Sequence, residues 1–141
     1  MALDARLTIE DKYSYDVQSL DYTIKQTTDP NTGQPTADPH FGSIDFNILA
    51  NNEDDCLFQR WVSSKDLKKN GEFALPITEG IYHKNMYLKF KDAFCTKLEV
   101  HYASYNEKQM YMRVSIQAKE MTFGNQSNSA IMTLINKFLS K

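Results

Sequence analysis

The stretch MYLKFKDAFCTKLEVHY, residues 86–102, decides the fold. Its apolar and polar side chains alternate, and the apolar face comprises Met86, Leu88, Phe90, Phe94, Leu98, Val100 and Tyr102. Period-two alternation is typical of a β-strand with one face against a core. Because a straight strand of this length reaches on the order of 55 Å, far beyond an ordinary strand, we expect a bend or bulge near Asp92.

The same alternation recurs along most of the chain. It is found in residues 3–9, 13–24, 43–50, 73–77 and 110–118. Between Val17 and Leu20 the phase changes by one residue, which predicts a β-bulge that keeps both halves of that strand on one core. The short link at 104–108 predicts an antiparallel hairpin.

Two segments have helical spacing instead. In residues 53–64 the apolar side chains Leu57, Phe58, Trp61 and Val62 follow a helical stripe. Asn52 is the expected cap, and Asp54 and Asp55 suit the positive end of the helix dipole. We expect this helix to pack Leu57 and Trp61 over one opening of a barrel or one face of a sheet.

The second helical segment, residues 129–140, follows a polar linker. Its apolar side chains recur at i, i+3, i+4, i+7 and i+8 and are Ile131, Leu134, Ile135, Phe138 and Leu139. So short a helix is marginal alone in water, so we expect it to dock on its own domain, on a neighbouring subunit or on a partner. The expected organisation is a β-barrel domain at 1–124, then a linker and amphipathic helix at 125–141.

These patterns predict a mainly all-β fold. One apolar and one polar face per strand favour an antiparallel sheet, which in a domain this small must curl or stack to bury its apolar face. We therefore expect a small antiparallel β-barrel with one flanking α-helix and the additional C-terminal helix. A β-sandwich is the second choice.

A proline-containing loop separates two of the strands. Residues 28–40 hold Pro30, Pro35 and Pro39, and Pro30-Asn31-Thr32-Gly33 reads as a turn. An irregular loop of this length is often functional. The sequence is equally compatible with a passive hairpin tip. The candidate interaction residues are Asp29, Pro30, Asn31, Thr32, Gly33, Gln34 and Pro35.

Composition excludes several classes of protein. The 141 residues include 16 Lys and Arg and 18 Asp and Glu, and a net charge of −2 argues against a nucleic-acid or membrane-surface binder. No apolar run is long enough for a membrane-spanning helix, and the first residues lack the pattern of a signal peptide. Two isolated cysteines fit a reducing cytoplasm.

Charge is distributed unevenly along the chain. Residues 1–70 carry 7 basic and 12 acidic side chains, whereas residues 71–141 carry 9 and 6. A head-to-tail homo-oligomer could use this asymmetry, although it is also compatible with no role at all.

The sequence offers no catalytic or metal-binding constellation. His40, His83 and His101 lack ligand spacing, and the glycines form neither a dinucleotide-binding motif nor a P-loop. Cys95 lies within an apolar strand, where a small buried thiol is the simpler interpretation. We therefore expect no enzyme activity, no cofactor and no metal.

The order of local patterns resembles the Hcp-type (TssD) tube proteins of type VI secretion systems, in their Bacteroidetes-like form. The resemblance covers about residues 1–124 and is most specific in the block at 88–95. The other matching segments are Ala5-Arg6-Leu7, Gln26-Thr27-Thr28-Asp29, Gly33-Gln34-Pro35, Gly42-Ser43-Ile44, Trp61, Lys69-Asn70-Gly71, Met110 and Ser115-Ile116-Gln117-Ala118.

The resemblance implies a structural function. Such proteins form hexameric rings that stack into a hollow tube within a contractile sheath, below a spike, and the lumen can carry effectors. It implies cytoplasmic assembly followed by export through the type VI machinery without a signal peptide. The loop at 28–40 is then expected to reach the adjacent subunit or ring, with no nucleic acid and no membrane insertion involved.

Two alternative functions remain open from the sequence. One is a monomeric β-barrel that binds a small apolar ligand, because aromatic residues are abundant in the strands. The other is an adaptor or cargo-carrying variant of the same family, in which the C-terminal helix docks a partner.

Overall fold

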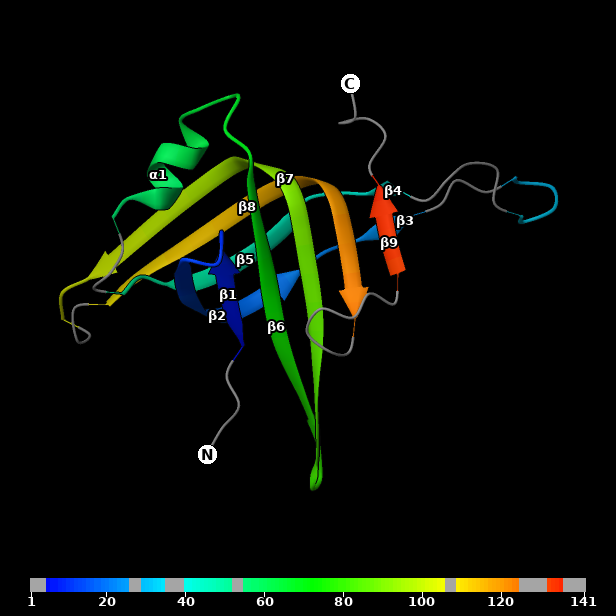
Figure 1. Ribbon diagram of the computed structural model, residues 1–141, viewed down its shortest axis with the longest axis horizontal. Coiled ribbons are helices and arrows are strands. Elements are labelled where there is room, and N and C mark those ends of the chain that lie inside the picture. Colours follow the sequence, from blue (N-terminus) through cyan, green and yellow to red (C-terminus); the bar gives the residue numbers. More distant parts are fainter. Residues whose placement is uncertain are drawn as a thin grey trace.

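The computed structural model describes residues 5–25, 29–34, 40–51, 55–105, 109–124 and 132–135. In this part of the chain one helix, α1 (Leu57–Val62), accompanies nine strands (Figure 1). The strands are β1 (Arg6–Ile9), β2 (Tyr13–Asp21), β3 (Ile24–Lys25), β4 (His40–Phe41), β5 (Ile44–Leu49), β6 (Lys69–Glu79), β7 (Tyr82–Ala103), β8 (Gln109–Gly124) and β9 (Met132–Ile135).

The sheet closes into a barrel. Its strands follow the order β5-β2-β1-β6-β7-β8, and β8 pairs again with β5. All of these pairs are antiparallel. β9 pairs with β8 beyond the start of β5, while β3 and β4 form a separate two-stranded sheet. The predicted antiparallel barrel with a flanking helix is therefore confirmed.

Bulges let the longest strands bend around this barrel. The register of β2 against β5 shifts between Val17 and Ser19, which confirms the bulge predicted from the phase change. In β7, Asp92 has a φ of 54°, and the register against β6 shifts beside it, as expected. A second shift in β7 falls between Cys95 and Lys97. Each extra residue increases the local bend and twist of its strand.

The bulge at Asp92 also reverses which side chains of β7 face inward. Leu88 and Phe90 are buried before it, and Ala93 and Cys95 are buried after it. The prediction that Phe94 shares the buried face was wrong, because that prediction carried one phase across the bulge. The ring of Phe94 instead lies 5.6 Å from the ammonium group of Lys68.

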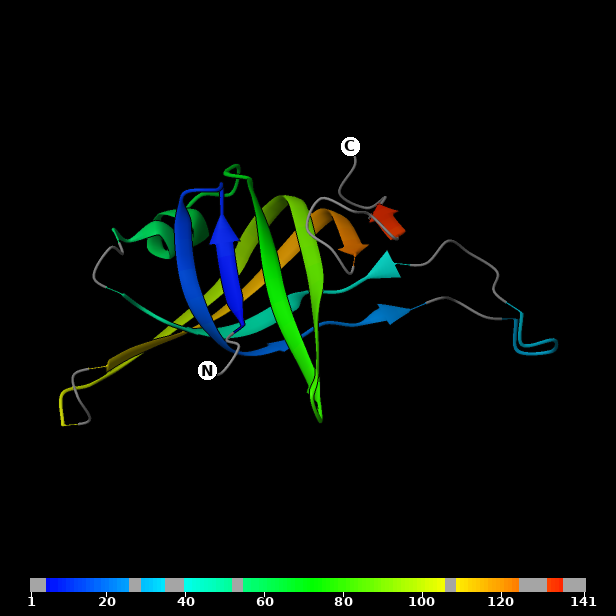
Figure 2. The ribbon, with the colours of Figure 1, turned by 60° about the horizontal axis from the view of Figure 1, so that its bottom comes forward.

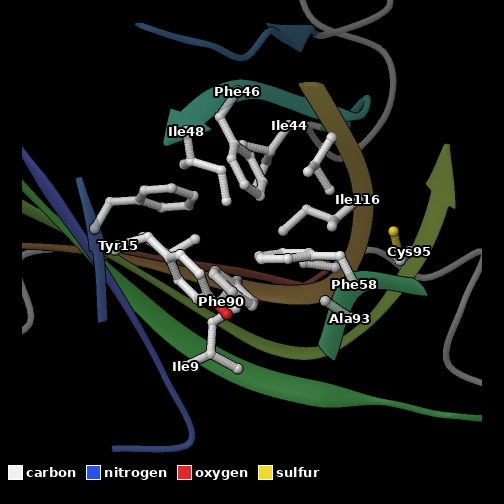
Figure 3. Packing of buried hydrophobic residues seen from close by; sticks show 14 of the residues in the cluster. Ile9, Tyr15, Ile44, Phe46, Ile48, Phe58, Phe90, Ala93, Cys95 and Ile116 are labelled. Carbon is white, nitrogen blue, oxygen red and sulfur yellow. The ribbon is translucent and has the colours of Figure 1, made fainter. Parts of the chain in front are cut away.

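The barrel interior is filled by large side chains from nearly every element. Figure 3 shows Tyr15, Ile44, Phe46, Ile48, Phe58 and Phe90 converging from different strands and from α1 on one centre. Aromatic rings meet mostly at inclined angles, with centroids 5.1 Å apart for Phe46 and Phe73 and 5.2 Å apart for Tyr15 and Phe58. Inclined contacts of this kind place ring edges against ring faces and stabilise a packed core.

The helix α1 is shorter than predicted and caps this core. It begins at Leu57, so its cap position is Cys56 rather than Asn52, and Cys56 has a left-handed conformation with no side-chain cap. Leu57, Phe58 and Trp61 are buried, which confirms the predicted stripe. The indole Nε1 of Trp61 donates to the carbonyl oxygens of Leu67 and Ala93, at 3.2 and 3.1 Å. Among the described residues, no helix is long and apolar enough to span a membrane.

The predicted C-terminal helix is wrong over its described part. Met132–Ile135 form β9, which pairs with Glu120–Phe123 of β8. Beyond the start of β5, the edge of β8 has backbone N–H and C=O groups that β5 does not pair with, and a further strand forms hydrogen bonds with them. A helix this short is only marginally stable alone in water, so the strand is favoured. Thr133 and Ile135 are β-branched and favour the extended conformation. Ile131, Phe138 and Leu139 lie outside the described residues.

Candidate assembly surfaces

The loop predicted to reach another subunit lies at the end of a projecting arm. β3 and β4 pair through Ile24 with Phe41 and Lys25 with His40, and they carry the chain away from the barrel. Figures 1 and 2 both show the described turn far out on one side of the molecule. Within the described structure, residues 29–34 therefore lie away from the barrel of their own copy.

The turn at residues 29–34, named here the loop tip, holds its shape by its own hydrogen bonds. The backbone N–H of Gly33 donates to the carbonyl oxygen of Asp29 at 2.8 Å, and the N–H of Asp29 donates to the carbonyl oxygen of Gln34 at 2.8 Å. The carboxylate of Asp29 accepts from the N–H of Asn31 at 2.8 Å. Gly33 has a φ of 75°, a conformation that glycine adopts without strain.

Of the candidate loop residues, Asp29 to Gln34 are thus brought together in one compact turn. Pro30, Asn31, Thr32, Gly33 and Gln34 are exposed, and Asp29 is half-buried. Pro35 lies outside the described residues. A preformed and exposed tip costs little conformational entropy when it binds, which suits a contact surface.

The two described C-terminal candidates, Leu134 and Ile135, lie on opposite faces of the strand that replaces the predicted helix. Leu134 lies opposite Met121 of β8 and packs, half-buried, against the core. Ile135 lies opposite Glu120 and is 53% exposed. The hydroxyl groups of Thr122 and Thr133 meet at 3.2 Å across the same strand pair. In the described part of this segment, Leu134 therefore docks on its own domain.

A second projection, which sequence reasoning missed, is the β6–β7 arm, residues 75–86. β1 pairs with β6 only as far as Ala74, and β8 pairs with β7 only from Tyr87 onward. Beyond these points β6 and β7 pair with each other alone, through Leu75 with Met86 and Ile77 with Lys84. Figures 1 and 2 show this ribbon extending below the barrel to a narrow tip.

The two faces of the β6–β7 arm differ in character. One face is polar, with Thr78 Oγ1 and His83 Nδ1 3.3 Å apart. The other carries Leu75, Ile77, Tyr82 and Met86 together with the charged residues Glu79 and Lys84, and Ile81 lies at the tip. The available sequence signal was Gly80 between the alternating runs at 73–77 and 86–90, which indicates a hairpin turn but not where the neighbouring strands stop pairing.

Two pockets of the described structure are lined by side chains on the outside of the barrel. The larger, of about 550 Å³, lies over β1, β6, β7 and β8 and is lined largely by polar side chains such as Thr8, Glu72, Lys89 and Glu120. These residues alternate along their strands with buried ones, so they face outward. The second pocket, of about 360 Å³, is lined by Asp21, Tyr22, Thr23, Lys25, Gly42, Ser43 and Asp45.

Cys95 and Asp55, which the sequence offered as potentially reactive side chains, have structural roles in the fold. Burial raises the pKa of the Cys95 thiol to about 11, so it stays protonated and is a poor nucleophile near neutral pH. The guanidinium of Arg60, with help from the hydroxyl of Tyr13, lowers the pKa of Asp55 and anchors the start of α1. Within the described ranges, no three His, Cys, Asp or Glu residues are placed to hold a metal ion.

A comparison of the sequence with protein families finds one match. The hemolysin coregulated protein Hcp (TssD) family matches residues 1–130. No curated protein matches the chain.

Solved structures with this barrel carry the same family name. Hcp1 from Flavobacterium johnsoniae is 21% identical, with a TM-score of 0.68 over 95% of this chain and 100% of that one. Hcp1 from Salmonella typhimurium is 11% identical, with a TM-score of 0.68 over 97% of both chains. The secreted protein Hcp3 from Pseudomonas aeruginosa is 8% identical, with a TM-score of 0.66 over 96% and 99%. At these identities the likeness establishes the fold.

Proposed function

The chain belongs to the hemolysin coregulated protein (Hcp, TssD) family of type VI secretion tube proteins, and on that premise we propose that it is a structural subunit of the inner tube. Copies join into hexameric rings, the rings stack into a hollow tube, and the lumen carries effectors. The sheath surrounds this tube and the spike closes its end. Assembly takes place in the cytoplasm, and the type VI machinery then exports the tube.

The observation that carries this proposal is the family match over residues 1–130 together with a barrel that superposes on Hcp structures. The arrangement of the described residues agrees with a structural role. Large apolar side chains fill the interior, and two arms project from the barrel. Projecting, preformed arms give each copy a means to contact its neighbours beyond the barrel wall.

The loop tip supports the stacking of rings in this proposal. It is exposed, it is shaped by its own hydrogen bonds, and it stands away from the barrel. We assign it the contact with a subunit of the adjacent ring or of the same ring.

The packed interior counts against the alternative of a monomeric ligand-binding barrel. Small barrels are usually filled by their own side chains, and here Phe46, Phe58, Phe73 and Phe90 form a chain of ring contacts through the centre. The two pockets described above lie outside the barrel and are bordered by charged residues. The second candidate is an adaptor or cargo-carrying variant of the tube protein. The observation that favours it is the exposed side chain of Ile135 on β9, which a partner could contact.

Light scattering on the purified protein tests the proposal. We expect a mass close to that of a hexamer of the 16.3 kDa chain, and rings in negative-stain micrographs. A monomer that persists at high protein concentration, with no rings in the micrographs, contradicts a tube subunit.

A further inference from the structure

β9 lies on an edge of β8 that the closed barrel leaves open. One edge of β8 pairs with β7 from end to end, over Gln109–Gly124. The other edge pairs with β5 only over Tyr111–Ile116, and with β9 over Glu120–Phe123. Since the pairing of β5 with β8 already closes the barrel wall, β9 is an added strand that closure does not require.

The part of β8 opposite β9 has the character of an edge to which another strand adds. Of its four residues only Glu120 is charged, Met121 is fully buried, and Phe123 packs, half-buried, against the core. Such an edge, with free backbone groups and an apolar inner face, is a template for strand pairing. The part between β5 and β9, residues 117–119, contains Lys119, a residue type that discourages such pairing. β9 therefore covers the more vulnerable segment of the edge.

The contacts of β9 close this edge from both faces of the sheet. The hydroxyl groups of Thr122 and Thr133 meet at 3.2 Å on the outer face, and Leu134 lies opposite Met121 and packs against the core on the inner face. β9 itself has four residues, and a very short edge strand is a poor template for further pairing. A longer open edge is thus replaced by a shorter one.

β9 is held chiefly because it belongs to the same chain. Met132 and Ile135 are 47% and 53% exposed, so β9 buries little apolar surface beyond the side chain of Leu134. Its advantage over a free strand is its tether, since β9 follows β8 in the sequence after residues 125–131. A tethered segment has an effective concentration on the order of millimolar at its site. A competing strand must exceed that value or meet an edge from which β9 is displaced.

We propose that β9 is a strap that keeps the β8 edge closed to strand addition. When β9 is displaced, the edge accepts the same edge of a second copy, because two identical strand edges pair antiparallel about a two-fold axis. In that pair an apolar side chain of the second copy takes the place of Leu134 beside Met121. This two-fold association is distinct from the head-to-tail contacts that close a ring, so β9 protects each copy from an unproductive dimer.

A proline variant, Thr133→Pro with Leu134→Pro, detaches the strap. Successive residues of a strand direct their N–H groups to opposite edges, so one of the two prolines removes a donor that faces β8. We expect circular dichroism close to that of the original protein, because the barrel closes without β9. Light scattering should give a mass above that of the original protein, and the excess should grow with concentration. The matched control, Thr133→Ser with Leu134→Val, keeps both donors and should keep the original mass.

A synthetic peptide of residues 130–137 with a fluorescent label tests whether the edge is accessible. The peptide binds only molecules whose β8 edge is free, so we expect at least about tenfold tighter binding to the proline variant than to the original protein. Fluorescence anisotropy measures both affinities. Saturating peptide should also return the mass of the proline variant to that of the original protein. The same peptide with Leu134→Asp is the control, because it places a charge beside the buried Met121 and should not bind.

The outcomes decide each part of the inference. A proline variant that keeps the original mass and binds the peptide no better than the original protein overturns it, as does equally tight binding by the original protein. Tight binding without a rise in mass supports the accepting edge and overturns the second copy as its occupant. Leu134→Asp in the full chain is the milder second variant if the proline variant does not fold. All readouts are relative to the original protein, so they stand apart from the test of the tube function.

Discussion

The backbone N–H of Asp92 donates a 2.9 Å hydrogen bond to the side-chain Oδ1 of Asn70 on the neighbouring strand. This bond lies at the bulge of β7, where Asp92 has a φ of 54°. The N–H of Asn70 in turn donates to the carboxylate of Glu10 at 3.2 Å, and its carbonyl oxygen accepts from the N–H of Glu10 at 2.9 Å. Asn70 therefore ties together the bend of β7, the start of β6 and the end of β1.

Replacing Asn70 with Ala is expected to lower the free energy of unfolding by about 1 kcal/mol, the usual worth of such a hydrogen bond. The reason is that the N–H of Asp92, held in a left-handed conformation, loses its partner. Urea denaturation measures the change. The control is Asn85→Ala, whose amide makes only a long contact of 3.4 Å with the hydroxyl of Tyr87 on the arm. Equal stability of the two variants contradicts the role given to Asn70.

Gly71→Ala is expected to destabilise the protein more strongly. A Cβ at Gly71 would overlap with Cζ of Phe90 and lie 2.9 Å from the carbonyl oxygen of Thr8. Phe90 is buried among other aromatic rings, so relief requires movement in the core, at a cost of about 1–3 kcal/mol. Gly42→Ala is the matched control, because nothing lies within 4 Å of a Cβ there. A melting temperature that falls equally in both variants would refute the steric explanation.

The two cysteines are expected to differ in reactivity. Cys56 is exposed, whereas Cys95 is buried and its thiol has a pKa raised to about 11. Because the thiolate is the reactive form, a maleimide near neutral pH should label Cys56 and leave Cys95 intact until denaturant is added. Mass spectrometry of peptides identifies the labelled site. Rapid labelling of Cys95 in the folded protein would contradict its burial.

Leu134→Ala is expected to lower the free energy of unfolding by about 1 kcal/mol, in proportion to the half-buried side chain that lies opposite Met121 and packs on the core. Ile135→Ala, on the exposed face of the same strand, should change it by less than half as much. Thermal unfolding of both variants provides the measurement. Indistinguishable melting temperatures would indicate that β9 contributes nothing to the domain and leave its apolar residues for a partner.

Replacing residues 30–35 with a short Gly-Ser link is expected to keep the barrel folded and to weaken the stacking of rings. The described tip makes its hydrogen bonds within itself, so the core loses nothing when it is removed. Circular dichroism checks the fold, and negative-stain microscopy and sedimentation compare tube lengths with those of the original protein. Tubes of unchanged length would show that the loop is a passive tip.

Sequence alone was sufficient for the class of fold and for the family. Alternation of apolar and polar residues predicts strands because side chains of a strand point to opposite faces, and this rule is local. The bulge after Val17 was also visible, since a shift of one residue in phase has one simple structural cause. The buried stripe of α1, Trp61 included, follows from helical spacing in the same local way.

What the tertiary structure alone decided depends on which strands lie side by side. Phe94 turned outward because the bend at Asp92 is formed with Asn70, a residue 22 positions away in the chain. Met132–Ile135 became a strand because the edge of β8 was open beyond β5, although their spacing is equally that of a helix. The apolar face of the β6–β7 arm looked like core in the sequence, and only the points where β1 and β8 stop pairing left it in solvent.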